Sequence, residues 1–255
     1  MKIVVLIKHV PDTWGERKLD PSSGWIDRTA SDTVIDEVGE RALEAALSFK
    51  DANDAEVVAL SMGPASAKDV LRKALAMGAD SAVHVLDDSL AGADLLRTAA
   101  VLSAAIDRVG FDLVIAGNES TDGRGGVVPA MIAERLGVPH ATHLNSLQIS
   151  MSDVTGERSS DYGAFDVRAA LPAIVSLTER APEPRFPNFK GIMRAKKKPL
   201  EVIDGVTLDA VHPSDAGSVI LTSQRSPARA AGTRVADDGT AADALVDFLF
   251  ANNLV

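Results

Sequence analysis

The sequence predicts an α/β protein with a doubly wound, mostly parallel sheet. Segments typical of strands and of helices alternate from the N-terminus to about Pro139, an order that places helices on both faces of a parallel sheet. The first strand is a continuous apolar run from Ile3 to Ile7, as expected for a strand covered on both faces. Three of the expected helices end at a glycine, which is a common C-terminal signal of helices.

The elements of this alternation can be placed in order. After a strand at residues 2–8 we expect a loop at 11–24, polar helix-start signals at 31–36, and a helical apolar period from 42 to about 50. The next expected elements are a strand at 56–61, a turn at 62–64, a helix at 66–77 closed by Gly78, a strand at 82–86, a helix at 93–109 closed by Gly110, a strand at 112–116, and a helix at 126–136 closed by Gly137.

The pattern changes after Pro139. Residues 144–150, 154–158 and 165–170 have the pattern of short strands separated by turns, which predicts a small antiparallel addition. The apolar residues 173–177 are expected to return to the main sheet.

The C-terminal part has a different composition. From Asp204 onward, prolines, glycines and small polar residues predominate, and only residues 241–250 have a helical pattern, with Leu245, Phe248 and Leu249 on one face. Such a segment buries little of its own surface, so it is either flexible or wraps a partner. We therefore expect an α/β nucleotide-binding domain at residues 1–204 and a C-terminal arm at 205–255.

The composition limits the classes of function. A chain of 255 residues with 46% hydrophobic and 24% charged residues is typical of one globular α/β core. The net charge of −10 argues against nucleic-acid binding, and no apolar stretch approaches the length of a membrane span. Because there are no cysteines, disulfides, thiolate metal sites and thiol nucleophiles are excluded, which fits a cytoplasmic location.

A glycine-rich segment after the fourth expected strand is the strongest candidate site. Ligands of open parallel sheets bind beyond the carboxyl ends of the strands, where glycine amides and a helix N-terminus favour an anion. The first loop and the turn at 62–64 should lie at the same edge. The motif is neither G-x-G-x-x-G nor a Walker A loop, so a flexible connector is the alternative. The segment consists of Gly117, Asn118, Glu119, Ser120, Thr121, Asp122, Gly123, Arg124, Gly125 and Gly126.

Signals for catalysis are weak. Among the five histidines only His140 and His143 have a spacing that suits metal ligands, and polar loop residues are the simpler interpretation. The chain has no G-x-S-x-G nucleophile elbow. We therefore expect no catalytic residue and no metal site.

The segment at residues 183–198 combines prolines, aromatic residues and lysines in a way that a globular core does not require. Pro184 and Pro187 stiffen it, Phe186 and Phe189 add apolar surface, and it ends in a block of lysines. One interpretation is a solvated loop with surface lysines. The other is a docking loop, because apolar side chains on a stiff segment bind a partner at low entropic cost.

Four blocks of sequence resemble the β subunit of electron transfer flavoprotein. They are residues 8–12 (KHVPD), 74–80 (ALAMGAD), 117–123 (GNESTDG) and 192–198 (IMRAKKK). The resemblance covers residues 1–204 well and the C-terminal part weakly. Blocks that occur in the same order are far more specific than any one of them.

The resemblance implies a non-catalytic subunit of a heterodimeric electron carrier. The partner α subunit would hold most of the FAD, and Thr13 matches a position that approaches the flavin ring. Electrons would come from acyl-CoA dehydrogenases and similar flavoenzymes and leave to a membrane quinone oxidoreductase, without insertion of this chain into the membrane. A structural AMP would be lined by Leu6, Asp36, Met62 and residues 117–126.

The resemblance also implies contacts with partners. Phe189 aligns with an apolar anchor that docks dehydrogenases. From the composition of residues 205–255, we expect the helical face of this arm to pack on the α subunit. In the family, the neighbourhood that corresponds to Glu157 helps to hold the mobile flavin domain, although Ser159 and Tyr162 differ here from many members. The other expected docking residues are Ile192, Met193, Lys196, Lys197 and Lys198.

Two alternatives remain open at this point. The nucleotide loop is shortened between Asp122 and Gly126, and electron-bifurcating members of the family place a second FAD in this cleft. The expected fold also resembles that of adenine-nucleotide α-hydrolases, so a stand-alone adenine-nucleotide-binding enzyme or sensor is the second alternative, since fold does not decide function.

Overall fold

The computed structural model describes residues 1–208, 218–224, 226–229 and 231–255. The chain divides into two compact units, residues 1–223 and 224–255. The strands of the described part all belong to the first unit.

The main sheet confirms the predicted fold class. Seven strands pair in the order β14-β7-β6-β1-β8-β13-β9, and every pair is parallel. β1 lies at the centre, where Val4 is in register with Val58 on one side and Val114 on the other. The strands are β1 (Lys2–Leu6), β6 (Glu56–Met62), β7 (Ser81–Leu86), β8 (Leu113–Gly117), β9 (His140–Leu144), β13 (Ala173–Leu177) and β14 (Leu200–Asp204).

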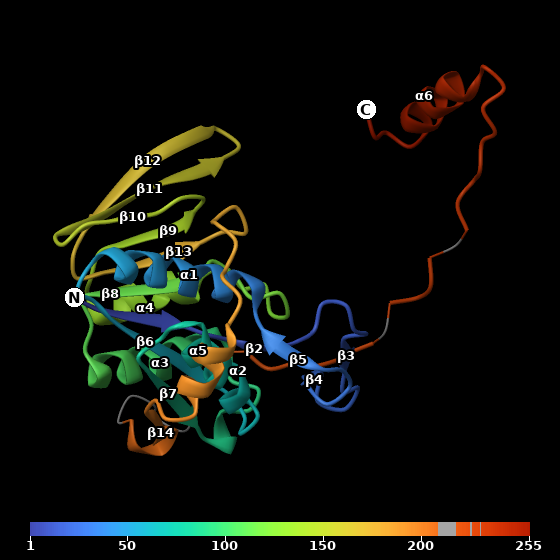
Figure 1. Cartoon of the computed structure of the whole chain (residues 1–255). Coiled ribbons are helices and arrows are strands. Elements are labelled where there is room, and N and C mark those ends of the chain that lie inside the picture. The colour runs from blue at the N-terminus through green and yellow to red at the C-terminus, as the bar shows by residue number, and fades with distance from the viewer. Residues whose placement is uncertain (209–217, 225, 230) are drawn as a thin grey trace. The chain divides into compact units, whose positions relative to one another are not determined.

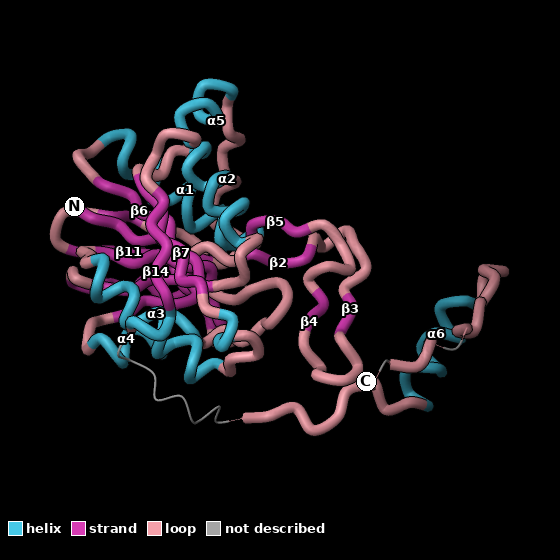
Figure 2. The backbone as a smooth tube through the Cα atoms, turned by 90° about the horizontal axis from the view of Figure 1, so that it is seen from below, coloured by secondary structure: helices cyan, strands magenta, loops and turns pink. Residues whose placement is uncertain are grey.

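Helices cover both faces of this sheet (Figure 2). Because successive side chains of a strand point to opposite faces, Ile3 and Val5 pack in the core beneath α1 and α2, whereas Val4 packs in the core beside α3 and α4. The helices are α1 (Glu37–Ala52), α2 (Ala67–Met77), α3 (Leu95–Val109), α4 (Val128–Leu136) and α5 (Phe189–Ala195), with short 3₁₀ helices η1 (Asp88–Leu90) and η2 (Gly205–Thr207).

Three small antiparallel sheets extend the main sheet. The largest is next to β9 and β13, and the other two lie beyond the carboxyl end of β1 (Figure 1). The three-stranded sheet contains β10 (Gln148–Ile149), β11 (Asp153–Ser160) and β12 (Gly163–Ala170), and the two-stranded ones pair β2 (His9–Pro11) with β5 (Thr33–Ile35) and β3 (Lys18–Leu19) with β4 (Ile26–Asp27).

The structure corrects several expected elements at the edges of the sheets. Residues 144–150 are not one antiparallel strand, because Leu144 ends the parallel strand β9 and only β10 joins the small sheet. β14 had no strand signal, since of its side chains only that of Ile203 is buried. The expected loop at 11–24 includes the end of β2 and all of β3.

The helix after the glycine-rich loop begins two residues later than expected. Gly126 has a φ of 67°, which is not helical, and Pro129 lies in the first turn of α4. Proline is favoured at the start of a helix because no helical hydrogen bond is lost there. The glycine amides of residues 125 and 126 therefore precede α4 instead of forming its first turn.

The second unit contains the expected C-terminal helix, α6 (Ala241–Ala251). None of its residues is buried, and Leu245 and Phe248 are more than half exposed. Part of the expected arm, at residues 209–217, 225 and 230, lies outside the described residues.

Candidate functional site

The glycine-rich loop follows β8 at the carboxyl edge of the sheet. Its first residue, Gly117, lies against the start of α1, where a Cβ would be 3.2 Å from the Val38 Cβ atom and 3.3 Å from the Gly39 nitrogen. A larger residue would push α1 away from β8. Glycine at this position therefore allows the first turn of α1 and the loop to share one edge of the sheet.

Asp36 joins the loop to α1. Its buried carboxylate accepts a hydrogen bond from the Val38 amide (3.2 Å), which caps the helix, and two from the amide (2.7 Å) and hydroxyl (2.8 Å) of Thr121. Two residues expected to bind the nucleotide are thus brought together from positions 85 residues apart. In this structure they stabilise each other and hold the loop.

Asp122 is the centre of a second network. The Lys8 ammonium donates to Asp122 Oδ1 (2.6 Å) and to Ser120 Oγ (2.9 Å), and Arg28 Nη2 donates to Asp122 Oδ2 (3.3 Å). Burial of Asp122 opposes ionisation, but the charge and hydrogen bond of Lys8, with help from Ser120 and Arg28, lower the pKa of this carboxyl. The charge of Lys8 is therefore largely compensated within the protein.

Two arginines of this edge were missed by sequence reasoning. Arg17 donates to Thr121 Oγ1 (2.8 Å), to the Thr121 carbonyl and to the Pro11 carbonyl (2.8 Å). Arg28 donates to the His9 carbonyl (2.6 Å) as well as to Asp122. Both lie in the region of the β2–β5 and β3–β4 pairs, and only the folding back of this region onto the loop gives them a role.

Several groups of the loop remain available for a ligand. The amides of Gly125 and Gly126 donate no hydrogen bond to any described residue, and the Asn118 Oδ1 atom is buried without a partner. Arg124 is exposed, with a φ of 47°. Free amides next to a cation suit a phosphate, and an unpaired amide oxygen suits a donor such as an adenine amino group. The residues present therefore fit an adenine nucleotide.

The remaining expected site residues lie around this loop. Leu6 and Met62, which end β1 and β6, are partly buried against the core beside α3 and α4. A Cβ on Gly126 would meet Glu119 Oε2 at 4.0 Å and His143 Nε2 at 3.8 Å. Thr13 is exposed, and its hydroxyl donates to Glu37 Oε1 (3.1 Å).

His9, in β2, is a buried group for which the sequence suggested no role. Neither imidazole nitrogen has a hydrogen-bond partner among the residues that the structure describes. Burial first, and then the positive charge of Arg28, lower the pKa of this histidine. The imidazole is therefore held neutral next to the loop.

The proline-containing segment is anchored at its base and exposed at its tip. Arg185 binds buried Glu44 of α1 through its amide (2.9 Å), Nε (2.8 Å) and Nη2 (2.7 Å). The Asn188 side chain caps α5 by accepting from the Gly191 amide (2.8 Å). Phe186 and Phe189 are 92% and 79% exposed, so neither side chain belongs to the core.

The three lysines of the basic block differ in their surroundings. The Lys198 ammonium donates to the carbonyls of Leu75 and Ala79 at the C-terminal end of α2, where a cation is stabilised by the helix dipole. Lys196 and Lys197 are exposed. The two exposed lysines, with Ile192 and Met193, are available to a partner, whereas Lys198 holds α2 and β14 together.

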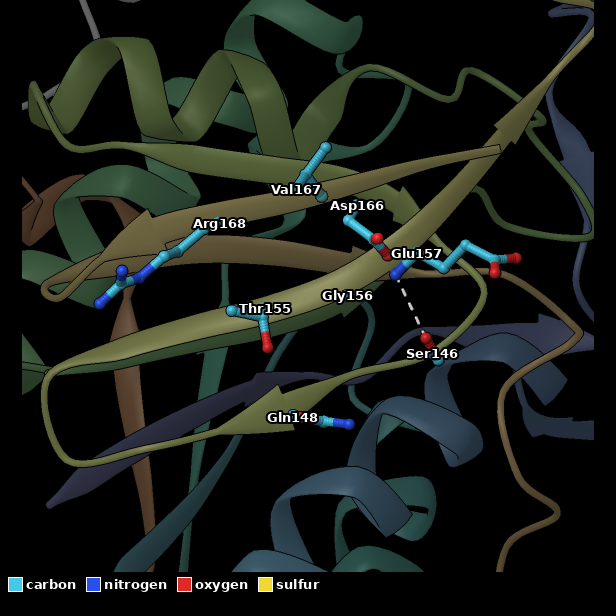
Figure 3. A pocket seen from close by; sticks show the side chains of 8 residues that line it. All are labelled: Ser146, Gln148, Thr155, Gly156, Glu157, Asp166, Val167 and Arg168. Carbon is cyan, nitrogen blue, oxygen red and sulfur yellow. Dashed lines mark hydrogen bonds between the residues drawn. The ribbon is translucent and has the colours of Figure 1, made fainter. Parts of the chain in front are cut away.

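A shallow cleft of about 280 Å³ lies in the three-stranded sheet. Figure 3 shows its lining side chains, with the Glu157 amide donating to Ser146 Oγ (3.2 Å). A Cβ on Gly156 would be 2.2 Å from the Ser146 carbonyl oxygen, so only glycine allows the chains to approach this closely. The lining residues are Ser146, Gln148, Thr155, Gly156, Glu157, Asp166, Val167 and Arg168.

In the described part of the chain, none of the helices has the length and apolar character that crossing a membrane requires. Among the same residues, no three His, Cys, Asp or Glu side chains are grouped so that they could hold a metal ion.

The fold and the loop define a doubly wound α/β protein of the class whose ligands bind at the carboxyl edge of the sheet. A family model described as "Electron transfer flavoprotein domain" matches residues 23–208. The chain belongs to this family, and its relatives place it among the β subunits.

Similarity to individual relatives extends over nearly the whole chain. The electron transfer flavoprotein subunit beta of Mycobacterium leprae is 48% identical over 263 residues, which cover 99% of each chain. That of Megasphaera elsdenii is 36% identical, covering 82% of this chain and 80% of the relative. Subunit CarD of the caffeyl-CoA reductase-Etf complex of Acetobacterium woodii is 33% identical, covering 92% of each. The resemblance seen in the sequence is thus confirmed.

Proposed function

We propose that this chain is the β subunit of a heterodimeric electron carrier, pairs with an α subunit that holds most of the FAD, and binds a structural AMP itself. It receives electrons from acyl-CoA dehydrogenases and other flavin dehydrogenases and passes them to a quinone oxidoreductase. In this role it serves fatty acid oxidation in the cytoplasm and needs no catalytic residue of its own. The full-length similarity to β subunits supports this proposal over a stand-alone enzyme or sensor.

The nucleotide assignment depends on one observation: the glycine-rich loop is held in place, but some of its hydrogen-bonding groups are unpaired within the described part of the chain. Asp36, Lys8 and Arg17 hold it through contacts with Thr121, Ser120 and Asp122, while its Gly125 and Gly126 amides and Asn118 Oδ1 have no partner among the described residues. A loop that is rigid but has unused donors is preorganised for an anion. In the bound state, the phosphate would accept hydrogen bonds from the Gly125 and Gly126 amides. The adenine amino group would donate a hydrogen bond to Asn118 Oδ1.

The assignment is tested by changing the charge of the loop without changing its shape. Asparagine and aspartate both tolerate the positive φ of Gly126 better than other side chains, but only aspartate adds a charge. We expect the purified αβ complex and its Gly126→Asn variant to release AMP in a stoichiometric amount on denaturation, and Gly126→Asp to release little. Mass spectrometry and chromatography of the extract measure this.

The other outcomes separate the alternatives. A second FAD per complex in place of AMP would show a flavin in this subunit, as in the bifurcating alternative. Absence of any nucleotide from the wild-type complex would contradict the assignment. Equal AMP loss in the Asn and Asp variants would show that the phosphate does not lie against this loop.

A further inference from the structure

A cavity of about 380 Å³ lies between the C-terminal end of α2 and α5. Four of its lining residues are cations and one is an acid, in a chain whose net charge is −10. Its lining residues are Lys50, Ala76, Met77, Gly78, Asp80, Asn188, Lys190, Gly191, Arg194 and Lys198.

Two of the four cations already have partners within the protein. Lys198 donates to the carbonyls of Leu75 and Ala79, and Lys50 pairs with Asp80 and donates to the Gly78 carbonyl (3.3 Å). Both therefore compensate the partial negative charge at the C-terminal end of α2. They complete the structure and leave little capacity for another anion.

The other two cations are uncompensated. Lys190 and Arg194 are exposed, and neither side chain makes a hydrogen bond or ion pair with the described residues. They are one helical turn apart on α5, a spacing at which like charges destabilise a helix. Burial, and then the charges of Lys50 and Arg194, lower the pKa of Lys198, as expected in a region of positive potential.

α5 carries an apolar pair beside this basic pair. Phe189 and Met193 are also one turn apart, with 79% and 49% of their surface exposed. The helix is held firmly, because Arg72 donates to the Ala195 carbonyl (2.8 Å) and Gly191 lies so close to α2 that a Cβ would be 2.3 Å from the Ala76 carbonyl oxygen. Both pairs are therefore presented in a fixed arrangement, which lowers the entropic cost of binding.

We infer that this cavity receives an acidic side chain of the protein that docks on α5, with Lys190 and Arg194 binding its carboxylate while Phe189 enters an apolar pocket of that protein. The inference rests on the proposed function, with the electron-donating dehydrogenase docking on the segment at residues 183–198. A protein is favoured over a free anion because a small anion would leave Phe189 and Met193 exposed to water. A carboxylate is the protein group that complements two adjacent cations.

The test uses the αβ complex and a reduced acyl-CoA dehydrogenase, with electron uptake followed at the flavin. We expect Arg194→Gln to raise the KM for the complex about tenfold, since a short-range contact between charged groups is lost, and Lys190→Gln to act in the same direction. Lys68→Gln removes an exposed charge from α2 but does not line the cavity, so it should have a much smaller effect. Melting temperatures should stay unchanged in all three variants, and kcat should be unaffected.

Three outcomes would overturn the inference. If Arg194→Gln and Lys190→Gln match Lys68→Gln while Phe189→Ala still slows uptake, docking occurs without the acidic contact. If Phe189→Ala also has no effect, the docking role itself fails. If inorganic phosphate raises the melting temperature of the wild-type complex but not of Arg194→Gln, the cavity binds a free oxyanion instead of a protein side chain.

Discussion

Three buried or nearly buried carboxylates determine how distant parts of this chain meet. Asp36 ties the glycine-rich loop to α1, Asp122 ties it to Lys8 and Arg28, and Glu44 ties α1 to Arg185. A buried carboxylate is costly unless it is hydrogen-bonded and paired, so each of these networks is stable only when complete. These networks hold in place both the glycine-rich loop and the proline-containing segment at residues 183–198.

The buried His9 should make stability depend on pH. Its pKa in the native state lies below the ordinary value of 6.5, so the unfolded chain binds the proton more readily. Stability should therefore decrease as pH falls below about 6.5. The charged and titratable groups that act on it are Arg28, Asp69, Asp122 and His84, and the two carboxylates limit the effect.

This prediction is measured by urea unfolding of the wild-type protein and His9→Gln between pH 7.5 and 5.5. The variant should lose less stability over this range, because it has no titrating group at this position. His140→Gln, at an exposed histidine, serves as the control and should behave like the wild type. Equal pH dependence in all three proteins would show that His9 is not held neutral.

At the scale of elements, the central strands could be recognised from their apolar sequence, whereas the edge strands could not. β1 and β8 are buried on both faces and were visible as apolar runs. β9 and β14 are edge strands with several exposed residues, and β3 and β4 have only two residues each. These strands form because a neighbouring strand of the same chain pairs with them, and the sequence pattern alone could not reveal this pairing.

The exposed start of α5 leads to a prediction about docking. Replacing Phe189 by alanine should lower kcat/KM for electron uptake from a reduced dehydrogenase by roughly 30-fold, which corresponds to about 2 kcal/mol for an aromatic interface residue. Folding and nucleotide content should not change, because the side chain is 79% exposed. Stopped-flow spectroscopy of the flavin and thermal unfolding measure the two quantities.

Phe186→Ala is a matched control, since Phe186 is also an exposed aromatic side chain of the same segment but lies outside the helix. It should have a smaller effect. Added salt should slow uptake by the wild type, because Lys196 and Lys197 attract acidic partners over distances that salt screens. Unchanged uptake together with a lower melting temperature for Phe189→Ala would contradict the docking role.

At the scale of the whole molecule, the first unit has a hydrophobic core, whereas the described residues of the C-terminal unit include no buried hydrophobic side chain. The first unit includes buried Leu208, which packs with the core beside α3 and α4. In the second unit, α6 has 11 residues and no buried side chain. A helix of this length is marginal in water by itself, so we propose that its apolar residues pack on the α subunit.

Deletion of residues 224–255 should impair assembly with the α subunit and leave the folding of residues 1–223 intact. The double substitution Leu245→Ser and Phe248→Ser in the full chain should have the same effect, because it removes the apolar face without shortening the chain. Co-purification and gel filtration of co-expressed subunits measure assembly. Normal heterodimer formation by the shortened chain would show that this unit has another purpose.

Deletion from residue 205 onward is a harsher test. It also removes Leu208 from the core, so it should lower the stability of the sheet domain as well as impair assembly. The difference between the two deletions distinguishes loss of a partner contact from loss of core packing.

The fold class, the order of the central strands and helices along the chain, the family and the glycine-rich loop were all readable from the sequence. Each depends on local information: the period of apolar residues, the glycines that end helices, and four short blocks of residues that occur in the same order as in the family. Whether the loop binds AMP stays a prediction.

Only the tertiary structure showed which distant residues meet. Arg17 and Arg28 hold the glycine-rich loop, Glu44 holds Arg185, and Lys198 binds the end of α2 while Lys196 and Lys197 stay exposed. These contacts join residues up to 141 positions apart. Long charged side chains have the same appearance in a sequence whether they are solvated or paired, because their environment is created only when separate segments pack together.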